Sequence, residues 1–287
     1  MFNKLEGLIW MDGSFIPCNQ ANIHLVTHGF HYGTAVFEGI RAYNGIIFKA
    51  QEHFDRLRKS ANLLRFNITQ SSQEMIEITK KLLQKNNTPD SYIRPIAWCG
   101  TNSMKISSLD MEVHLAIASW GWSQTLNKNL RLVVSSWRRP DPRSAPVGAK
   151  ATGMYTLSSL AKNDAQLQGF DDALMLDCHD HIAESTVSNI FFIQENTLYT
   201  PIPTCFLNGI TRQTIIQIAK NLKIEVIEKS LKLEDMNSKT EAFLTSTAVE
   251  IQSIESIADE NKVWSFPSQN LTNIIKQEFK KMTQGVL

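Results

Sequence analysis

Several features that would assign this 287-residue sequence to a particular class of protein are missing. Its four cysteines, Cys18, Cys99, Cys178 and Cys205, form no C-x-x-C pair, so nothing supports a zinc ribbon or a dithiol redox site. Unpaired cysteines are typical of a reducing compartment. No run reaches the roughly 18 apolar residues of a membrane-spanning helix, and residues 1–12 lack the apolar core of a signal peptide. We therefore expect a cytoplasmic protein.

An excess of charge of one sign is also missing. The chain has 29 Lys and Arg against 28 Asp and Glu, a net charge of +1. Such a balance does not favour nucleic acid or an anionic membrane as the main partner, although a few positive groups can still hold a small anion. The composition, with 43% hydrophobic and 20% charged residues, is that of a globular protein, and the length predicts about two domains.

The common nucleotide, hydrolase and metalloprotease motifs are absent as well. The sequence has no G-x-G-x-x-G, Walker A, G-x-S-x-G or H-E-x-x-H segment. His179 and His181 form an H-x-H between two expected strands, which we interpret as a solvated turn. His28 and His31 have no third ligand nearby, so packing or hydrogen bonding is the better interpretation. We expect no metal site.

The first half of the chain predicts a small α+β unit. Asp12-Gly13 and Asn44-Gly45 each separate two short apolar runs, which is typical of β-hairpins. The second hairpin is expected to pair residues 36–43 with residues 46–48. Further along, the patterns predict helices over 50–66 and 72–86, the second opened by a Ser71–Glu74 capping box, and strands over 92–99 and 113–120.

A polar stretch near the middle predicts a break between domains. The segment GWSQTLNKN predicts an interdomain linker at 123–129, between a small domain of residues 1–122 and a large domain of residues 130–287. In the large domain we expect strands over 130–137, 173–177, 190–193 and 241–244, and helices over 154–168, 211–222 and 269–282. Gly169 is expected to end the first of these helices.

One segment has the pattern of a phosphate-binding turn. Leu207-Asn208-Gly209-Ile210-Thr211 leads into an amphipathic helix, and Thr211 can cap that helix. The N–H groups of a first helical turn, together with the helix dipole, favour a phosphate. By itself the pattern is also that of an ordinary helix start after a turn.

A second segment has the pattern of a cofactor lysine. Lys150 lies in VGAKATG, where small neighbours allow a flat ligand to approach its amine. Lysine amines form Schiff bases with aldehydes, although a surface lysine on a glycine-rich loop is the simpler alternative. Taken together, this lysine and the phosphate turn indicate pyridoxal phosphate. Glu184 is a candidate for the carboxylate that faces the ring nitrogen, although an isolated glutamate in a turn is usually solvated.

These residues belong to a wider resemblance. The sequence resembles the fold-type IV pyridoxal-phosphate enzymes over nearly its whole length, and it looks most like branched-chain amino-acid aminotransferases. The segments that carry the resemblance are LIWMDGSFI (8–16), THGFHYGTAVFEGIRAY (27–43), SYIRP (91–95), AKATGMY (149–155), GFDDALMLD (169–177), NGITRQTII (208–216) and LTSTAVEI (244–251). The resemblance implies an α/β (α+β) fold with a small N-terminal domain, a larger barrel-like C-terminal domain and the cofactor between them.

The resemblance also implies a reaction and an assembly. The reaction is the reversible ping-pong transfer of an amino group between L-leucine, L-isoleucine or L-valine and 2-oxoglutarate. Pyridoxal 5'-phosphate is the implied cofactor. The small domain of a second subunit completes the pocket in this family, so a homodimer or a larger homo-oligomer such as a hexamer is implied.

Roles for individual residues follow from the same resemblance. Lys150 would bind the cofactor aldehyde and move the substrate proton, and Glu184 would pair with the ring nitrogen. Tyr155 would hydrogen-bond the phenolic oxygen, and Leu207 would pack on the ring. The phosphate would be held by Arg56, Ile210, Thr211 and Thr247. The substrate pocket would be lined by Tyr32, Phe37, Gly39, Tyr92, Trp120 and Ala248, with Arg94 as the group that binds the side-chain carboxylate of 2-oxoglutarate.

The sequence departs from the branched-chain pattern near the substrate. Val187 replaces a small residue, Ser188-Asn189 is closer to D-amino-acid aminotransferases, and the loop over 100–110 is shorter than in many relatives. The tyrosine that the family has on the interdomain loop, past Trp120, is absent, and Trp122 is close to that position but not at it. The Ser188-Asn189 pattern leaves a D-amino-acid or (R)-amine aminotransferase as the main alternative. An aminodeoxychorismate lyase of the same fold and a cofactor-bearing protein without turnover are further alternatives.

Overall fold

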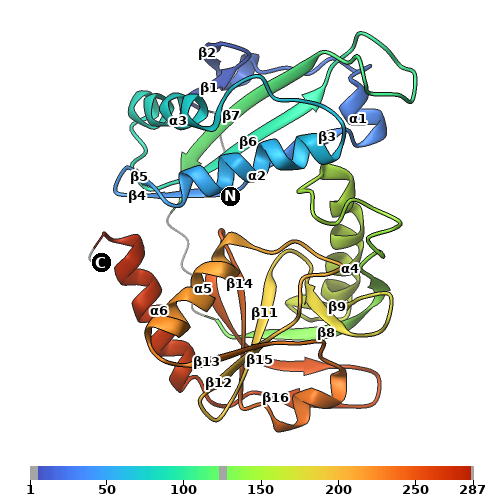
Figure 1. The fold of residues 1–287 in the computed structure, drawn as a ribbon, viewed down its shortest axis with the longest axis vertical. Helices are drawn as coiled ribbons and strands as arrows, with labels where there is room; N and C mark the ends of the chain where they lie inside the picture. Colours follow the sequence, from blue (N-terminus) through green and yellow to red (C-terminus); the bar gives the residue numbers. More distant parts are fainter. Residues whose placement is uncertain (1–5, 123–127, 286–287) are drawn as a thin grey trace. The chain divides into compact units, whose positions relative to one another are not determined.

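The computed structural model describes residues 6–122 and 128–285. The chain divides into two compact units, Met1–Ser123 with Ala149–Met154, and Gln124–Gly148 with Tyr155–Leu287 (Figure 1). Ala149–Met154 thus belongs to the first unit. The predicted domains, residues 1–122 and 130–287, are continuous segments and would place it in the second. Most of the expected linker at 123–129 lies outside the described residues, so its exact extent stays a prediction.

A mostly antiparallel sheet forms the centre of the first unit. Its strands lie in the order β2-β1-β7-β6-β4-β5, and β3 also pairs with β6. The two predicted hairpins are confirmed, but residues 36–43 form two strands with a break at Glu38-Gly39. The strands are β1 (Leu8–Met11), β2 (Ser14–Pro17), β3 (Ala35–Phe37), β4 (Ile40–Tyr43), β5 (Ile46–Ile47), β6 (Ser91–Cys99) and β7 (Val113–Gly121).

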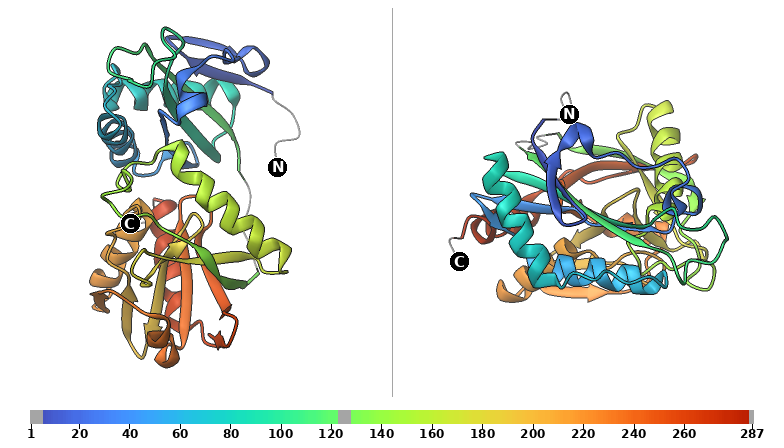
Figure 2. Two further views of the ribbon diagram at one scale, coloured as in Figure 1. Left: turned by 90° about the vertical axis from the view of Figure 1, so that its right-hand side faces the viewer. Right: turned by 90° about the horizontal axis from the view of Figure 1, so that it is seen from above.

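Two amphipathic helices cover one face of this sheet. They are α2 (Ala50–Leu63) and α3 (Ser72–Asn86), and they lie side by side in Figure 2. The predicted capping box at Ser71 and Glu74 is present. The buried core between the helices and the sheet includes Phe54, Leu57 and Ile93, and also Ala149 and Ala151. These two alanines tie the segment that carries Lys150 to the first unit. The unit also contains the short helix α1 (His28–Tyr32) and 3-10 turns at Cys18–Gln20 and Thr152–Met154.

A closed barrel forms the second unit. Its sheet runs β10-β9-β8-β15-β14-β11, and β10 pairs back onto β11 through Glu184 and Asn189. The closed ring encloses a core that includes Leu174, Phe192 and Leu244, while β12 and β13 extend the sheet from β11 and β16 pairs with β15. The strands are β8 (Leu130–Arg138), β9 (Asp172–Leu176), β10 (Ile182–Ser185), β11 (Asn189–Gln194), β12 (Thr197–Thr200), β13 (Glu225–Glu228), β14 (Glu241–Ser246), β15 (Glu250–Ala258) and β16 (Val263–Ser265).

Three helices pack on the outside of the barrel. Helix α4 (Tyr155–Leu167) packs on β8 and β9, whereas α5 (Ile210–Asn221) and α6 (Asn270–Thr283) pack against each other and on β14 (Figure 1). A 3-10 segment, Leu233–Ser238, precedes β14. The three helices match the predicted ranges within about two residues, and Gly169 has the positive φ of +80° expected after α4. Among the described residues, no helix is long and apolar enough to cross a membrane.

Candidate active site

Lys150 is held at the backbone by the first unit. Its N–H donates to Ser60 Oγ at 3.0 Å, and its carbonyl accepts from the N–H of Phe37 at 3.1 Å. The next residue, Ala151, forms a bridge with Val36 of β3. The lysine amine lies 5.0 Å from the centre of the Phe37 ring. These contacts fix Lys150 beside the end of β3.

An aromatic wall with one guanidinium lies next to this amine. Tyr92 and Arg94 project from the same face of β6 because they are two residues apart. Trp120 lies opposite Tyr92 on the neighbouring strand β7. The Tyr92 and Trp120 rings are 5.0 Å apart. The Arg94 guanidinium lies 4.8 Å from the Phe37 ring and donates to Tyr92 Oη at 3.1 Å. An amine and a guanidinium therefore share one phenylalanine ring.

Gly39 and Trp122 complete this wall. A Cβ on Gly39 would stand 2.0 Å from Tyr92 Oη, so only glycine allows the tyrosine to lie there. The Trp122 ring is 5.2 Å from Tyr92. Trp122 thus lies on the same wall, although the sequence pattern does not align it with the expected tyrosine. Tyr32, another predicted pocket residue, is exposed on α1 and donates to the carbonyl of Met104.

Arg56, on α2, belongs to a buried cluster of charge. Its Nε and Nη2 donate to Glu38 Oε1 and Oε2 at 2.6 and 2.9 Å. His53, one turn earlier on α2, donates through Nδ1 to Glu38 Oε2 at 2.8 Å, since a carboxylate only accepts. Glu38 and His53 are fully buried. The predicted phosphate-binding arginine is thus oriented by a carboxylate from the break between β3 and β4.

Burial and pairing act in opposite directions on this cluster. Burial raises the pKa of Glu38, but the charge of Arg56 and the hydrogen bonds from His53 and Arg56 outweigh it and hold that pKa well below its ordinary value. Burial lowers the pKa of His53, and the nearby charges of Arg56 and Lys150 act in the same direction against the attraction of Glu38. The cluster is therefore a carboxylate, a guanidinium and a neutral imidazole.

In the second unit, Glu184 is part of a strand. The sequence suggests a turn at this position, but the residue lies in β10 and is 8% exposed. Its Oε1 is 3.0 Å from Arg139 Nη2, and its Oε2 accepts from Asn189 Nδ2 at 3.1 Å. Arg139 is itself anchored by the carbonyls of Ser185 and Thr186 at 3.1 and 2.8 Å. The carboxylate is thus buried with its charge balanced and its orientation fixed.

The helix start predicted to hold phosphate has its N-cap two residues earlier than expected. Gly209 is the N-cap of α5, so Thr211 lies inside the first turn and does not cap it. Gly209 has no side chain to accept from the first-turn N–H groups, which suits an external anion. Ile210 and Thr211 are buried, and Leu207 is half-buried. Thr247 and Ala248 lie in the turn between β14 and β15, and Tyr155 is the first residue of α4.

The structure therefore assembles the predicted residues in two groups. The first unit brings together Lys150, Phe37, Gly39, Tyr92, Arg94 and Trp120, with Arg56 on the adjacent helix. The second unit contains Glu184, Leu207, Ile210, Thr211, Thr247 and Ala248, with Tyr155 at the start of α4. The contacts expected between members of different groups, such as Arg56 with the N-terminus of α5, stay predictions.

Four further residues have supporting roles that the sequence does not assign. Glu38 and His53 hold Arg56, while Arg139 and Asn189 hold Glu184. Glu38 lies within the FEGIR motif, directly after a run of apolar residues, and charged residues in such surroundings are rarely buried unless they are paired. Arg139 carries no comparable signal, because it lies in a loop rich in proline and arginine.

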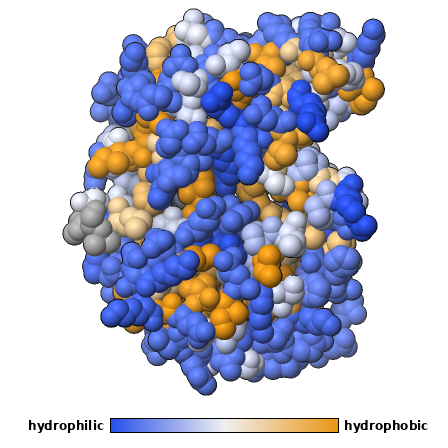
Figure 3. Space-filling view, viewed as in Figure 1, coloured by the Kyte–Doolittle hydropathy of each residue, from blue (hydrophilic) through white to orange (hydrophobic). Residues whose placement is uncertain are grey.

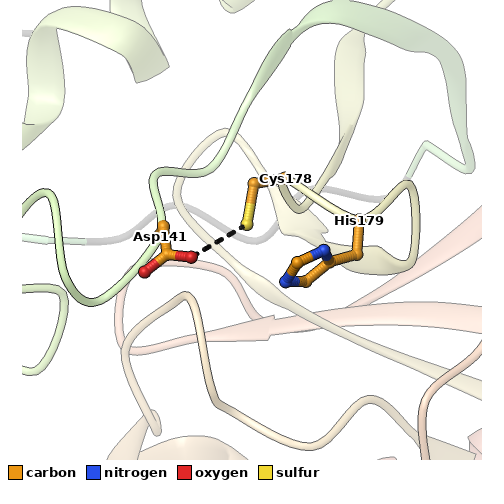
Figure 4. A group of neighbouring side chains, drawn as sticks. All are labelled: Asp141, Cys178 and His179. Carbon is orange, nitrogen blue, oxygen red and sulfur yellow. Dashed lines mark hydrogen bonds between the residues drawn. The ribbon is translucent and has the colours of Figure 1, made fainter.

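A group of possible metal ligands lies away from these residues. Ligand atoms of Asp141, Cys178 and His179 are within 4.8 Å of one another, and Cys178 Sγ donates to Asp141 at 3.8 Å (Figure 4). Arg143 binds both oxygens of Asp141 at 2.9 Å. Desolvation and nearby groups, Cys205 and Asp141 among them, raise the pKa of the Cys178 thiol, which disfavours the thiolate that binds metals. His181 is not part of the group.

The second unit is a barrel with a buried carboxylate and an uncapped helix start, and the first unit holds a fixed lysine beside an aromatic wall. These features are those of a fold-type IV aminotransferase. The chain belongs to this family, since the class IV aminotransferase family matches residues 35–257.

Within this family, the chain is similar to several branched-chain aminotransferases. The chain is 43% identical over 285 residues to a probable branched-chain-amino-acid aminotransferase of Rickettsia felis, covering 98% of each chain. It is 35% identical to the branched-chain-amino-acid aminotransferase of Escherichia coli K12, covering 99% of this chain and 96% of the relative. The crystal structure of the branched-chain amino acid aminotransferase from Thermobaculum terrenum in its PLP-form matches with a TM-score of 0.89 at 30% identity, covering 98% of this chain and 94% of the other.

Proposed function

We propose that this protein is a pyridoxal-phosphate-dependent branched-chain aminotransferase. It would transfer an amino group reversibly between L-leucine, L-isoleucine or L-valine and 2-oxoglutarate by a ping-pong reaction. The observation that carries the proposal is the pairing of Lys150 and Arg94 over the Phe37 ring, at 5.0 and 4.8 Å. A nucleophilic amine and a cation that can bind a carboxylate thus both lie against the same apolar ring.

The residues present fit pyridoxal phosphate. Its phosphate suits the N-terminus of α5, where Gly209 leaves the first turn without a side-chain cap. Its ring nitrogen suits Glu184, a buried carboxylate that Arg139 and Asn189 hold in place. Lys150 suits its aldehyde, while Arg56 and Thr247 would add to the phosphate contacts, Tyr155 would donate to the phenolic oxygen, and Leu207 would pack on the ring. When bound, the cofactor supplies an electron sink that the side chains lack.

The chain's own groups then have separate tasks. Lys150 would hold the cofactor and afterwards take and return the proton at the substrate Cα through Nζ. Glu184 would keep the ring nitrogen protonated. Glu38 and His53 would keep the Arg56 guanidinium in one orientation, because the buried carboxylate binds it at two points.

The substrate wall accounts for two kinds of substrate. Phe37, Tyr92 and Trp120 offer apolar surface for a branched side chain, and Arg94 offers a charged donor for the side-chain carboxylate of 2-oxoglutarate. Single methylene groups change binding to an apolar pocket by only about 1–3 kcal/mol, so leucine, isoleucine and valine should all react. Gly39, Tyr32 and Ala248 would complete the pocket.

A donor panel tests this function. Purified protein with pyridoxal phosphate is given L-leucine, L-isoleucine, L-valine, D-alanine or aminodeoxychorismate, with 2-oxoglutarate as acceptor, and the 2-oxo acid or pyruvate formed is measured. The proposal expects turnover with the three branched L-amino acids. Preference for D-alanine would support the D-amino-acid alternative, and pyruvate from aminodeoxychorismate would support the lyase. No turnover with any donor would contradict all three enzymes.

We also propose a homo-oligomer, at least a dimer. Exposed apolar side chains gather on and around α1 and on the loop between β6 and β7, namely Ile23, Leu25, Phe30, Ile106 and Leu109, each more than half exposed. The two segments are in contact, since Tyr32 bonds to Met104 and His28 to Lys105. Figure 3 shows apolar atoms at this edge of the first unit. A patch of this kind is typical of a subunit interface.

A further inference from the structure

We propose that Asn189 is a positioning residue that couples the ring-nitrogen end of the cofactor site to its phosphate end. The inference rests on the proposed function, because it takes Glu184 and the N-terminus of α5 as the groups that face the cofactor. One amide holds both and thereby sets the spacing between them.

The first half of the coupling is the contact with Glu184. Asn189 Nδ2 donates to Glu184 Oε2 at 3.1 Å, and both side chains are buried. The two residues also pair at the backbone, Glu184 in β10 with Asn189 in β11, in the pairing that closes the barrel. With Arg139 on Oε1, each carboxylate oxygen has its own donor. The carboxylate therefore cannot rotate without losing one of them.

The second half is the contact with the turn before α5. Asn189 Nδ2 also donates to the carbonyl of Leu207 at 3.0 Å, and its Oδ1 accepts from the N–H of Gly209 at 3.0 Å. These two bonds span the turn on both sides of Asn208. They set the direction in which α5 begins, and with it the direction of the N–H groups of its first turn.

Only a primary amide can make this set of contacts. The carboxylate of Glu184 and the carbonyl of Leu207 only accept, and the N–H of Gly209 only donates, so the orientation of the amide follows from its partners. Aspartate would place a second carboxylate beside Glu184, and serine lacks the second donor. Glycine at 209 is required by the same contact, since a Cβ there would stand 2.3 Å from Asn189 Oδ1.

The experiment measures binding by the cofactor-free protein. Wild type, Asn189→Ala and Asn189→Asp are titrated with pyridoxal 5'-phosphate, with pyridoxal, which lacks the phosphate, and with inorganic phosphate. Asn237→Ala is the matched control, since it removes a side-chain amide of the same unit whose oxygen accepts from Trp264 Nε1 at 3.0 Å. Circular dichroism at the titration temperature establishes the folded fraction of each variant, so that binding is compared between folded proteins.

We expect both Asn189 variants to bind pyridoxal and phosphate at least about tenfold more weakly, with aspartate the worse of the two. The control should change each dissociation constant less than about twofold. Unchanged binding of both probes by folded Asn189→Ala would overturn the proposal, and so would a loss confined to one probe. Wild-type protein that binds no pyridoxal phosphate would instead contradict the proposed function.

A second variant tests the steric half of the coupling without depending on Asn189→Ala alone. Gly209→Ala should weaken binding of inorganic phosphate, because its Cβ pushes on the Asn189 amide. It should also weaken binding of pyridoxal, since the displaced amide loses Glu184. If Gly209→Ala weakens the binding of inorganic phosphate but leaves the dissociation constant of pyridoxal at its wild-type value, Asn189 does not couple the two ends of the site.

Discussion

Arg56 donates two parallel hydrogen bonds to Glu38, Nε to Oε1 at 2.6 Å and Nη2 to Oε2 at 2.9 Å, and the carboxylate is fully buried. A bidentate pair of this kind fixes the plane of the guanidinium as well as its position. Glu38 comes from the break between β3 and β4, and Arg56 from the second turn of α2. The pair therefore ties the helix to the strand segment that also holds the backbone of Lys150.

Replacing Arg56 with alanine should have two separate effects. The buried Glu38 carboxylate loses its main partner, so the free energy of unfolding should fall by about 3–5 kcal/mol. If Arg56 also binds the phosphate, pyridoxal phosphate should be lost faster on dialysis. Chemical denaturation and absorbance after dialysis measure the two effects, with Lys59→Ala, an exposed change on the same helix, as the control. Lower stability with unchanged cofactor retention would remove Arg56 from the phosphate site.

Stability should depend on pH through His53 and Glu38. Burial keeps His53 neutral in the fold, whereas the unfolded chain takes up a proton below about pH 6.5. The unfolded state then binds more protons, so the free energy of unfolding should fall as the pH drops through that value, and fall further once unfolded Glu38 protonates near its ordinary pKa of 4.5. Denaturation of wild type and His53→Gln between pH 8 and 5 measures the first part. The variant should show a smaller fall, and an identical profile would mean that His53 does not contribute.

Lys150→Ala should abolish the visible absorbance of the lysine-bound cofactor and reduce turnover at least about 1,000-fold, the scale of a lost general acid–base group. Spectra and rates of Lys220→Ala, an exposed change in the last turn of α5, provide the comparison. A Lys150 variant that keeps both the absorbance and the rate would refute the mechanism.

Arg94→Ala should act on one substrate class more than the other. Loss of a charged hydrogen bond costs about 1.5–3 kcal/mol, so kcat/KM for 2-oxoglutarate and glutamate should fall about tenfold to 100-fold. Leucine should change much less, because its side chain makes no use of the guanidinium. Steady-state kinetics with both substrates measure the difference. Equal losses would indicate that Arg94 only supports Phe37 and Tyr92, which its guanidinium contacts.

A charge on the exposed apolar patch should weaken assembly. Phe30→Glu places a carboxylate on α1, where the wild-type side chain is 74% exposed. Sedimentation equilibrium should show a dimer or larger oligomer for wild type and a shift toward the monomer for the variant. Ile274→Glu, on the exposed side of α6, should leave the oligomer intact. A wild-type monomer would contradict the proposed assembly.

Local patterns were sufficient for most of the helices and hairpins. The capping box at Ser71 and the Asn44-Gly45 turn depend on residues next to one another in sequence, and both are present. Strands β10, β12, β13, β15 and β16 were not predicted. One of them, β15, pairs in parallel with the distant strand β8, a contact that a local pattern does not encode.

The sequence by itself determined the family, and its motifs predicted Lys150, Glu184 and the turn before α5 as the chemical groups of the site. Only the tertiary structure decided which residues hold these groups in place. Ser60 and Phe37 hold the backbone of Lys150, and Arg139 and Asn189 hold the Glu184 carboxylate. Glu38 orients the guanidinium of Arg56. Motifs record which groups the chemistry needs. The supporting contacts join residues up to 113 positions apart, as between Phe37 and Lys150, so they exist only once the sheet of the first unit and the barrel of the second have formed.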